Sequence, residues 1–138
     1  MTRIFWDTHV FLYLFEGGAF AGDVKRLRER MLARRDRLFT SSLTLGEILV
    51  RPLALGADEA AVYDAAVTRA ATILPFDAEA ARHYARFRAQ TSIAAPDAVQ
   101  LACAAAAGID MFITNDDRLS SQVVPGIKFI TPLSRAFL

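Results

Sequence analysis

The stretch RIFWDTHVFLYLF, residues 3–15, places two hydrophobic patterns next to each other. Residues 3–6 form a short apolar run that stops at Asp7, which is typical of a buried strand, and residues 8–15 carry apolar side chains at helical spacing. We therefore expect a strand, a polar turn and a helix. The same alternation runs along the whole chain and predicts an α/β fold. The apolar runs show little internal alternation, as expected for a parallel sheet that is covered on both faces.

The remaining elements follow from the same patterns. The expected strands are 3–6, 38–40, 73–76, 111–114 and 127–130. The expected helices are 8–15, 23–37, 43–49, 58–72, 77–90 and 96–107, with Asp23 as the N-cap of the second. Pro75 indicates a short or edge strand, and Arg51-Pro52 is expected to end the third helix because proline lacks a backbone N–H. No course is predicted for the apolar tail at 131–138.

Length and composition indicate one domain spanning residues 1–138. The chain has 138 residues, of which 54% are hydrophobic and 22% charged, so it is expected to be globular rather than disordered. Charged residues interrupt every apolar run before the roughly 18 residues that a membrane helix needs, and we expect no signal peptide. The single cysteine, Cys103, cannot form an internal disulfide. A reducing, cytoplasmic location is therefore expected.

Four acidic residues lie where a strand has just ended or a helix is just starting. They are Asp7, Glu47, Asp97 and Asp116. In an open parallel sheet the carboxyl ends of the strands, and the helices that follow them, line one crevice where ligands bind. We therefore expect the four carboxylates to share one rim and to attract a cation.

Each of these acids also has a purely structural explanation. Asp7 can cap the helix that follows it, and Thr44-Leu45-Gly46-Glu47 fits a capping box. Asp97 suits the first turn of a helix electrostatically, and residues 115–117 suit a polar turn. Taken together, these explanations do not account for an acid at every strand exit on one rim, or for Asp97 in an otherwise apolar stretch.

The donor types indicate which cation would bind. Four carboxylates and a single cysteine favour Mg²⁺ or Mn²⁺ over zinc. Such a site does not require His9, and His83 is expected on a helix surface. The sequence contains neither the nucleophile elbow of serine hydrolases nor a P-loop or dinucleotide-binding glycine motif, so acyl-enzyme chemistry and a nucleotide cofactor are disfavoured.

At these residues the chain resembles the PIN domain. The resemblance rests on Asp7-Thr8, on Ser41 or Ser42 with Glu47, on Pro96-Asp97-Ala98 and on Thr114-Asn115-Asp116. It covers nearly the whole chain, whose length is similar to that of the VapC-type ribonuclease toxins of type II toxin–antitoxin systems. The departures are His9, where a small polar or apolar residue is frequent, and Leu119, where an aromatic residue often follows the last acid.

The resemblance implies a fold, an activity and a partner. The fold would be a Rossmann-like parallel sheet of about five strands flanked by helices. The activity would be Mg²⁺- or Mn²⁺-dependent endoribonucleolytic hydrolysis of RNA phosphodiester bonds. The partner would be a VapB-type antitoxin that blocks the site, and the toxin would form a homodimer, for which the apolar end at Phe137-Leu138 and the alanine-rich helices are candidate contacts.

Our hypothesis for the site assigns a role to each acid. Asp7 and Asp97 share the principal ion, while Glu47 and Asp116 complete its ligation or hold a second ion. Thr8, Thr114 and Asp117 are expected to orient these carboxylates or bound water. The choice between Asp116 and Asp117 as the fourth ligand, and between one ion and two, stays open.

Arginine dominates the basic residues and suggests contacts with phosphate or with an acidic partner segment. Arg26, Arg30 and Arg34 recur at helical spacing, and Arg86 belongs to a second basic helix. A solvated helix face explains the same spacing. The formal net charge of +1 argues by itself against a polyanionic substrate, but without the four candidate ligands 16 basic side chains face 11 acidic ones, a balance of +5.

Two other functions remain open at this stage. A PIN-like domain without activity could act as an RNA- or protein-binding module, although binding alone does not require four carboxylates on one rim. A Mg²⁺-dependent phosphatase could use Asp7 as a nucleophile after the first strand. Such phosphatases carry a second aspartate two residues later, where this chain has His9.

Overall fold

Five strands form one parallel sheet in the order β3-β2-β1-β4-β5. The strands are β1 (Arg3–Trp6), β2 (Arg37–Ser41), β3 (Thr72–Leu74), β4 (Met111–Ile113) and β5 (Phe129–Thr131). Every neighbouring pair in this computed structural model is parallel. The predicted α/β class and parallel sheet are confirmed. β3 is short and lies at an edge, as Pro75 indicated.

The structure describes residues 2–136. The apolar chain end that we associated with a homodimer, Phe137 and Leu138, lies outside the described residues. No helix within 2–136 is long and apolar enough to span a membrane.

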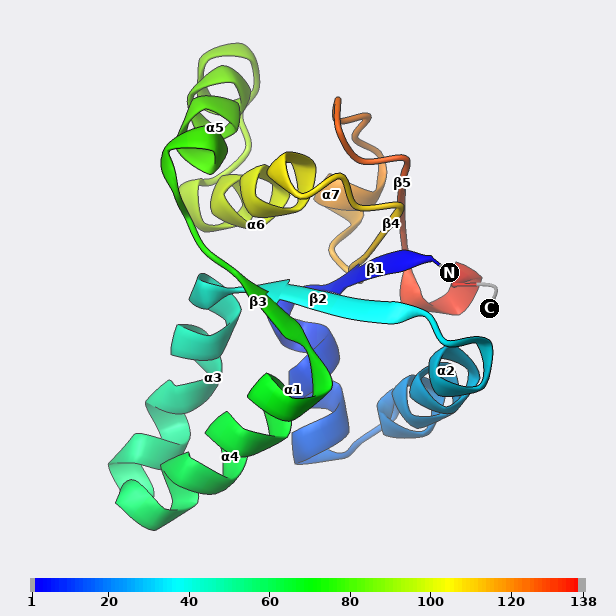
Figure 1. Ribbon diagram of the computed structural model, residues 1–138, viewed down its shortest axis with the longest axis vertical. Coiled ribbons are helices and arrows are strands. Elements are labelled where there is room, and N and C mark those ends of the chain that lie inside the picture. The colour runs from blue at the N-terminus through cyan, green and yellow to red at the C-terminus, as the bar shows by residue number, and fades with distance from the viewer. Residues whose placement is uncertain (1, 137–138) are drawn as a thin grey trace.

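Helices cover both faces of the sheet (Figure 1). On one face lie α1 (Thr8–Glu16), α2 (Ala21–Arg34), α3 (Ser42–Leu55) and α4 (Ala57–Ala70), and on the other lie α5 (Ala78–Gln90), α6 (Ala95–Ala106) and the short α7 (Asp117–Ser120). A 3₁₀ turn, η1 (Leu133–Arg135), packs near α2. The three layers explain why the strands are apolar on both sides.

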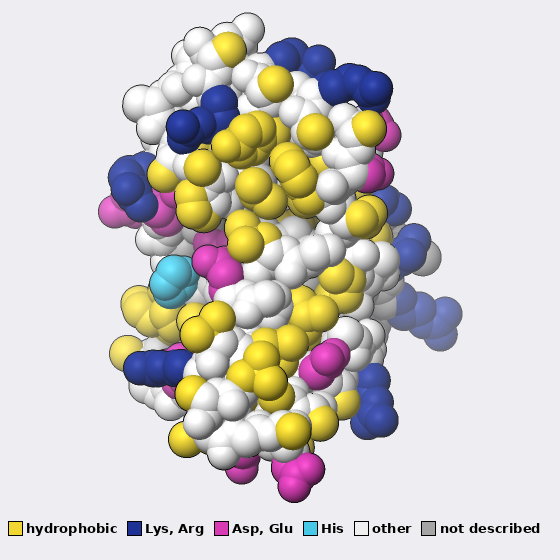
Figure 2. Space-filling view, turned by 90° about the vertical axis from the view of Figure 1, so that its left-hand side faces the viewer, with side chains coloured by type: hydrophobic (Ala, Val, Ile, Leu, Met, Phe, Trp, Pro, Cys, Tyr) yellow, Lys and Arg dark blue, Asp and Glu magenta, His cyan; other side chains and the backbone are white. Residues whose placement is uncertain are grey.

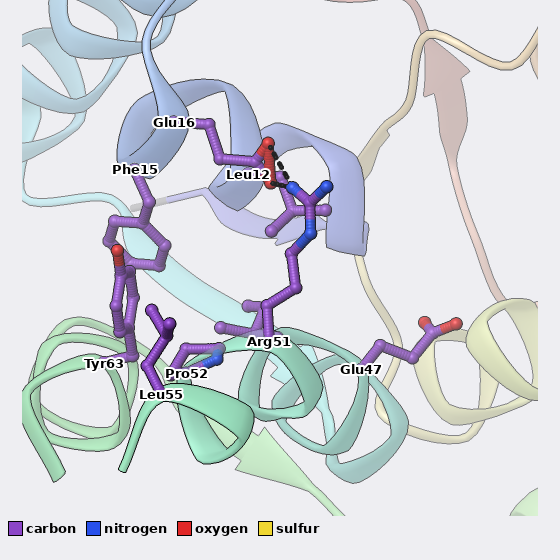
Figure 3. Close-up of a pocket in the computed structure, with 9 residues that line it drawn as sticks. Leu12, Phe15, Glu16, Glu47, Arg51, Pro52, Leu55 and Tyr63 are labelled. Carbon is purple, nitrogen blue, oxygen red and sulfur yellow. Dashed lines mark hydrogen bonds and ion pairs between the residues drawn. The ribbon is translucent and has the colours of Figure 1, made fainter. Parts of the chain in front are cut away.

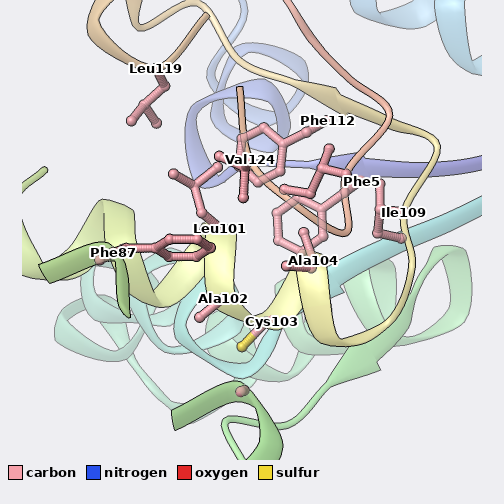
Figure 4. Packing of buried hydrophobic residues seen from close by; sticks show 14 of the residues in the cluster. Phe5, Phe87, Leu101, Ala102, Cys103, Ala104, Ile109, Phe112, Leu119 and Val124 are labelled. Atoms are coloured by element: carbon pink, nitrogen blue, oxygen red, sulfur yellow. The ribbon is translucent and has the colours of Figure 1, made fainter. Parts of the chain in front are cut away.

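Each face of the sheet has its own hydrophobic core. On one face the rings of Phe5 and Phe112 stack with their centroids 4.7 Å apart, against the alanine-rich helix α6 (Figure 4). On the other, Trp6 meets Phe11 edge-on at 5.1 Å. Because successive residues of a strand point to opposite faces, β1 contributes Phe5 to one core and Trp6 to the other.

Helix α2 differs from its predicted bounds at both ends. It begins at Ala21, so Asp23 lies inside its first turn and is not the N-cap. It ends at Arg34 because Arg35 adopts a left-handed conformation with φ 60°, and the N–H of Asp36 returns to the carbonyl of Met31. The chain can then enter β2 directly at residue 37.

Helix α3 continues through the proline that was predicted to end it, so this prediction is wrong. Pro52 lies inside the helix, which runs to Leu55. Its side chain is buried, as is that of Ile48 one turn earlier, and this packing outweighs the loss of one backbone hydrogen bond. The other predicted ends fall within two residues of the observed ones, but α7 and η1 were missed because each spans fewer than five residues.

Candidate active site

The four acids predicted to share a rim lie around two adjoining hollows at the carboxyl end of the strands. One hollow, of about 320 Å³, is lined by Asp7, His9, Tyr13, Asp97, Asn115, Asp116 and Arg118. The other, of about 70 Å³, is lined by Asp7, Thr8, His9, Glu47, Pro96, Asp97, Gln100 and Leu119. Figure 2 views the molecule from this side and shows acidic side chains beside a histidine at mid-height, between two apolar patches.

Asp7 is the most buried of the four acids. It follows β1 and caps α1, where its carboxylate accepts the backbone N–H of Val10 at 3.3 Å. The side chain of Thr114, at the end of β4, also donates to it. Burial raises the pKa of Asp7 above its ordinary value, although the hydrogen bonds from Thr114 and Val10 counteract the shift. Asp7 is therefore both the predicted cap and a destabilised carboxylate facing the cavity.

Glu47 is exposed, and its carboxylate accepts a hydrogen bond from a buried hydroxyl. The N-cap of α3 is Ser41, which accepts the N–H of Thr44 at 3.2 Å, so the capping-box explanation of Glu47 does not apply. The Glu47 carboxylate instead accepts the Thr8 hydroxyl at 2.6 Å. Thr8 thus donates a hydrogen bond to one of the four carboxylates.

A buried amide that the sequence analysis did not single out lies behind this pair. Gln100 on α6 donates to the hydroxyls of Thr8 at 3.1 Å and Thr44 at 2.7 Å, and accepts the hydroxyl of Ser41. The available signal was an amide three residues after Asp97 in an apolar helix, because residues three apart share one helix face.

Asp97 lies in the first turn of α6, as expected. Its pKa is raised by burial and by the negative charges of Asp116 and Glu47, and it is lowered by Arg118 and His9. The two neighbouring acids act on Asp97 although they come from other segments of the chain. The fold therefore brings three of the predicted carboxylates within electrostatic reach of one another.

Asp116 has a partner that the sequence analysis missed. Its carboxylate caps α7 and makes a two-pronged ion pair with Arg118, with distances of 3.1 Å to Nε and 2.7 Å to Nη2. This contact holds the pKa of Asp116 below its ordinary value. The same guanidinium lies 4.0 Å from Asp97. Asp117 begins α7, is exposed and does not line the cavity.

The four arginines proposed for RNA or antitoxin contact do not line these hollows. Arg34 pairs with Asp36 at 3.5 Å, and Arg86 contacts His83, which is half-buried, at 3.2 Å. Arg26 pairs with Asp23 on α2, and together with Arg30 it lines a separate groove between α2 and η1. Any contact of these side chains with a ligand would therefore lie away from the acidic cluster.

Comparison with known families identifies the fold. The family model of the PIN domain matches residues 4–123. The chain belongs to the PIN domain family. No curated protein matches the sequence.

Solved structures similar to this PIN domain include toxin–antitoxin complexes. VapBC2 from Rickettsia felis, bound to a promoter DNA fragment, has a TM-score of 0.74 at 15% identity and covers 95% of this chain and 98% of its own. DNA-bound VapBC from Salmonella typhimurium has a TM-score of 0.72 at 23% identity, with coverage of 96% and 99%. VapC20 of Mycobacterium tuberculosis, described as a sarcin-ricin loop cleaving toxin, has a TM-score of 0.65 at 21% identity, with coverage of 88% and 97%.

The donor set of this PIN domain suits a hard divalent cation. Four carboxylates line connected hollows, threonine hydroxyls support two of them, and the single thiol is buried elsewhere in the core. In residues 2–136 no three His, Cys, Asp or Glu side chains meet closely enough to hold an ion as they stand. The Arg118 guanidinium pairs with Asp116 and lies 4.0 Å from Asp97, so a positive charge already lies beside two of these acids.

An apolar groove of about 310 Å³ adjoins the acidic cluster (Figure 3). It lies between α1, α3 and α4 and is lined by Leu12, Phe15, Glu16, Glu47, Ile48, Arg51, Pro52, Leu55 and Tyr63. Arg51 reaches Glu16 across its rim at 3.4 Å. Figure 3 shows Glu47 at the far end, with its carboxylate directed away from Phe15 and Tyr63. The groove and the acidic hollows therefore share Glu47.

Proposed function

We propose that this PIN domain, spanning residues 1–138, is a Mg²⁺- or Mn²⁺-dependent endoribonuclease that acts in the cytoplasm as the toxin of a toxin–antitoxin pair. The observation that carries the proposal is the cluster of Asp7, Glu47, Asp97 and Asp116 around two adjoining hollows. The raised pKa values of Asp7 and Asp97 support it, because a cation would stabilise both carboxylates in their charged form. The RNA-cleaving description of VapC20 supports RNA as the substrate.

Each proposed ligand is positioned by the chain itself. Asp7 and Asp97 would hold the principal ion, with Glu47 and Asp116 completing the site. Such an ion neutralises charge on the scissile phosphate and makes bound water more acidic. Thr114 orients Asp7, and Thr8 orients Glu47.

Arg118 is the exposed cation of this site. It lies at the mouth of the larger hollow and pairs with Asp116, so it lowers the negative charge that an incoming RNA phosphate meets. The four carboxylates would otherwise repel a polyanion.

Incubation with total cellular RNA tests the activity. Wild-type protein should fragment RNA in Mg²⁺ or Mn²⁺ and leave it intact in EDTA. The Asp97→Asn variant, which differs by one oxygen-for-nitrogen exchange, should be inactive in all three conditions. RNA that stays intact at every metal concentration would instead favour a binding module.

We also propose that an antitoxin occupies the apolar groove next to Glu47. Similar solved structures are VapBC complexes, and exposed apolar side chains lie along α3 and α4, with Leu55 78% exposed. A segment in this groove would reach Glu47 and block the acidic cluster. A second copy of the chain is the other partner that we propose, forming a homodimer that sedimentation velocity would detect.

Copurification tests the groove. The chain would be coexpressed with the product of an adjacent short reading frame. Leu55→Asp should abolish copurification and leave RNA cleavage unchanged, because the side chain is exposed and far along the groove from Glu47. Val123→Asp, an exposed apolar side chain between α7 and β5, is the matched surface control and should copurify normally. Equal binding by both variants would place the antitoxin elsewhere.

A further inference from the structure

A chain of buried hydrogen bonds leads from the interior to the Glu47 carboxylate. Its members are Ser41, Gln100, Thr44 and Thr8, and each is at most 7% exposed. The members come from β2, α6, α3 and α1, so the network joins four elements. A buried polar network of this size has to be fully satisfied, and this leaves little freedom in where each hydrogen points.

The amide orientation of Gln100 follows from Ser41. The Ser41 oxygen accepts the backbone N–H of Thr44 at 3.2 Å, and its buried hydroxyl hydrogen, which also needs a partner, is donated to the Gln100 carbonyl oxygen. The Gln100 NH₂ group therefore faces the two threonines, at 3.1 Å from Thr8 and 2.7 Å from Thr44.

The orientation of Gln100 in turn decides where the Thr8 hydrogen points. Because the Thr8 oxygen accepts from the amide, its hydrogen is free to be donated to Glu47 at 2.6 Å. With the amide reversed, both threonines would donate to the Gln100 oxygen, and the Thr8 and Glu47 oxygens would face each other without a hydrogen. Without the amide, Thr8 and Thr44, whose hydroxyls lie 3.3 Å apart, could satisfy each other instead.

We propose that Gln100 is a positioning residue that keeps the Thr8 hydroxyl donating to Glu47 and so fixes this carboxylate at the rim of the acidic cluster. The proposal rests on the nuclease function proposed above. The two amide hydrogens of Gln100 are donated to Thr8 and Thr44, so Gln100 acts on Glu47 through Thr8. This role explains why an amide is buried in α6, a helix whose other buried side chains are Leu, Ala and Cys.

The test compares three variants: Thr8→Val, Gln100→Met and the double variant that carries both changes. Thr40→Val is the matched control. Thr40 is a fully buried threonine whose hydroxyl donates to the carbonyl of Trp6 at 2.8 Å, outside this network. Isothermal titration should show Mn²⁺ affinity about tenfold weaker in Gln100→Met and Thr8→Val, and unchanged in Thr40→Val. The double variant should be no weaker than Thr8→Val alone, because both changes act through one hydrogen bond.

A spectroscopic measurement without metal separates this proposal from the proposed function. The ¹³C signal of the Glu47 side-chain carboxyl should move in the same direction in Thr8→Val and Gln100→Met and stay in place in Thr40→Val. If wild-type protein neither binds Mn²⁺ nor cleaves RNA, the proposed function fails, and the carboxyl signals still decide the role of Gln100.

Gln100→Glu provides a second variant should Gln100→Met not fold. It keeps the shape of the side chain and an acceptor for Ser41, but in its ionised form it replaces the two amide hydrogens by an acceptor that draws the threonine hydrogens away from Glu47. The Glu47 signal should then move as in Thr8→Val. An unmoved Glu47 signal, or losses of Mn²⁺ affinity that multiply in the double variant, would overturn the proposal.

Discussion

Asp110 at the amino end of the sheet and Asp7 and Asp97 at its carboxyl end have opposite surroundings. At the amino end of the strands, Asp110 accepts the backbone N–H of Arg3 at 2.8 Å and pairs with Lys128 at 3.1 Å. The Arg3 N–H, together with Lys128, holds the pKa of Asp110 below its ordinary value. At the carboxyl end, burial raises the pKa values of both Asp7 and Asp97, and the neighbouring acids Asp116 and Glu47 raise that of Asp97 further.

The difference separates structural acids from functional ones. Asp110 receives from the chain itself the donors and the positive charge that a carboxylate needs, so it ties the ends of β1 and β5 together. Asp7 and Asp97 face a cavity, and the chain gives them too few hydrogen-bond donors and too little positive charge to compensate for their burial. Carboxylates that a fold crowds together without enough compensation indicate a site for an external cation.

Removing single acids gives the largest expected contrast between the two ends. Asp7→Asn and Asp97→Asn should each lower RNA cleavage by about 1,000-fold or more, because each loses a proposed ligand of the catalytic ion. Asp110→Asn should cleave within about twofold of wild type. Gel-based cleavage rates, with circular dichroism to verify folding, provide the measurement. A fully active Asp97→Asn variant would contradict the assignment of Asp97 as a ligand of the catalytic ion.

Stability in EDTA should change in opposite directions at the two ends. Asp110→Ala should lower the free energy of unfolding by about 1 kcal/mol, because it removes the acceptor of the Arg3 N–H. Asp7→Asn should raise it by about 1 kcal/mol, because asparagine caps a helix as well as aspartate does and carries no buried charge. Urea denaturation at pH 7 measures both. A destabilised Asp7→Asn variant would show that the buried charge is already compensated.

The contribution of Asp110 should also depend on pH with a defined sign. Its pKa is lower in the folded state, so its stabilisation is present above the unfolded pKa and is lost as the pH falls through the folded value. The stability difference between wild type and Asp110→Ala should therefore shrink below about pH 4. Urea midpoints from pH 7 to pH 2.5 measure this, and a difference that stays constant over the range would contradict the assignment.

The smallest expected effect concerns the arginine inside the acidic cluster. Arg118→Gln should tighten Mn²⁺ binding by about threefold, because its guanidinium pairs with Asp116 and competes with an incoming cation for that carboxylate. Arg86→Gln, on the surface of α5, should leave the affinity unchanged. Weaker binding in Arg118→Gln would mean that the arginine organises the acids rather than competing with the ion.

The sequence was sufficient to predict the sheet and to single out the four acids as candidates, because both depend on local patterns. Asp7 directly follows β1, Asp116 comes shortly after β4, and Asp97 lies in the first turn of α6, so each acid is placed by the element next to it. The path of α3 through Pro52 could not be predicted, since it depends on packing with distant residues.

The contacts of Gln100 and Arg118 with the site could not be predicted from the sequence either. Gln100 meets Thr8 across 92 positions of sequence, and no local pattern encodes such a contact. Arg118 is only two residues from Asp116, but a basic residue in a polar turn is usually solvated, so its pairing with Asp116 carries no sequence signal.

Titration of Mn²⁺ into metal-free protein tests the contrast between the two ends most directly. Wild type and Asp110→Asn should bind Mn²⁺ with the same affinity, whereas Asp7→Asn and Asp97→Asn should show no binding at concentrations that saturate wild type. Unchanged binding in Asp97→Asn, or loss of binding in Asp110→Asn, would contradict the conclusion that the acids at the carboxyl end of the sheet form the cation site.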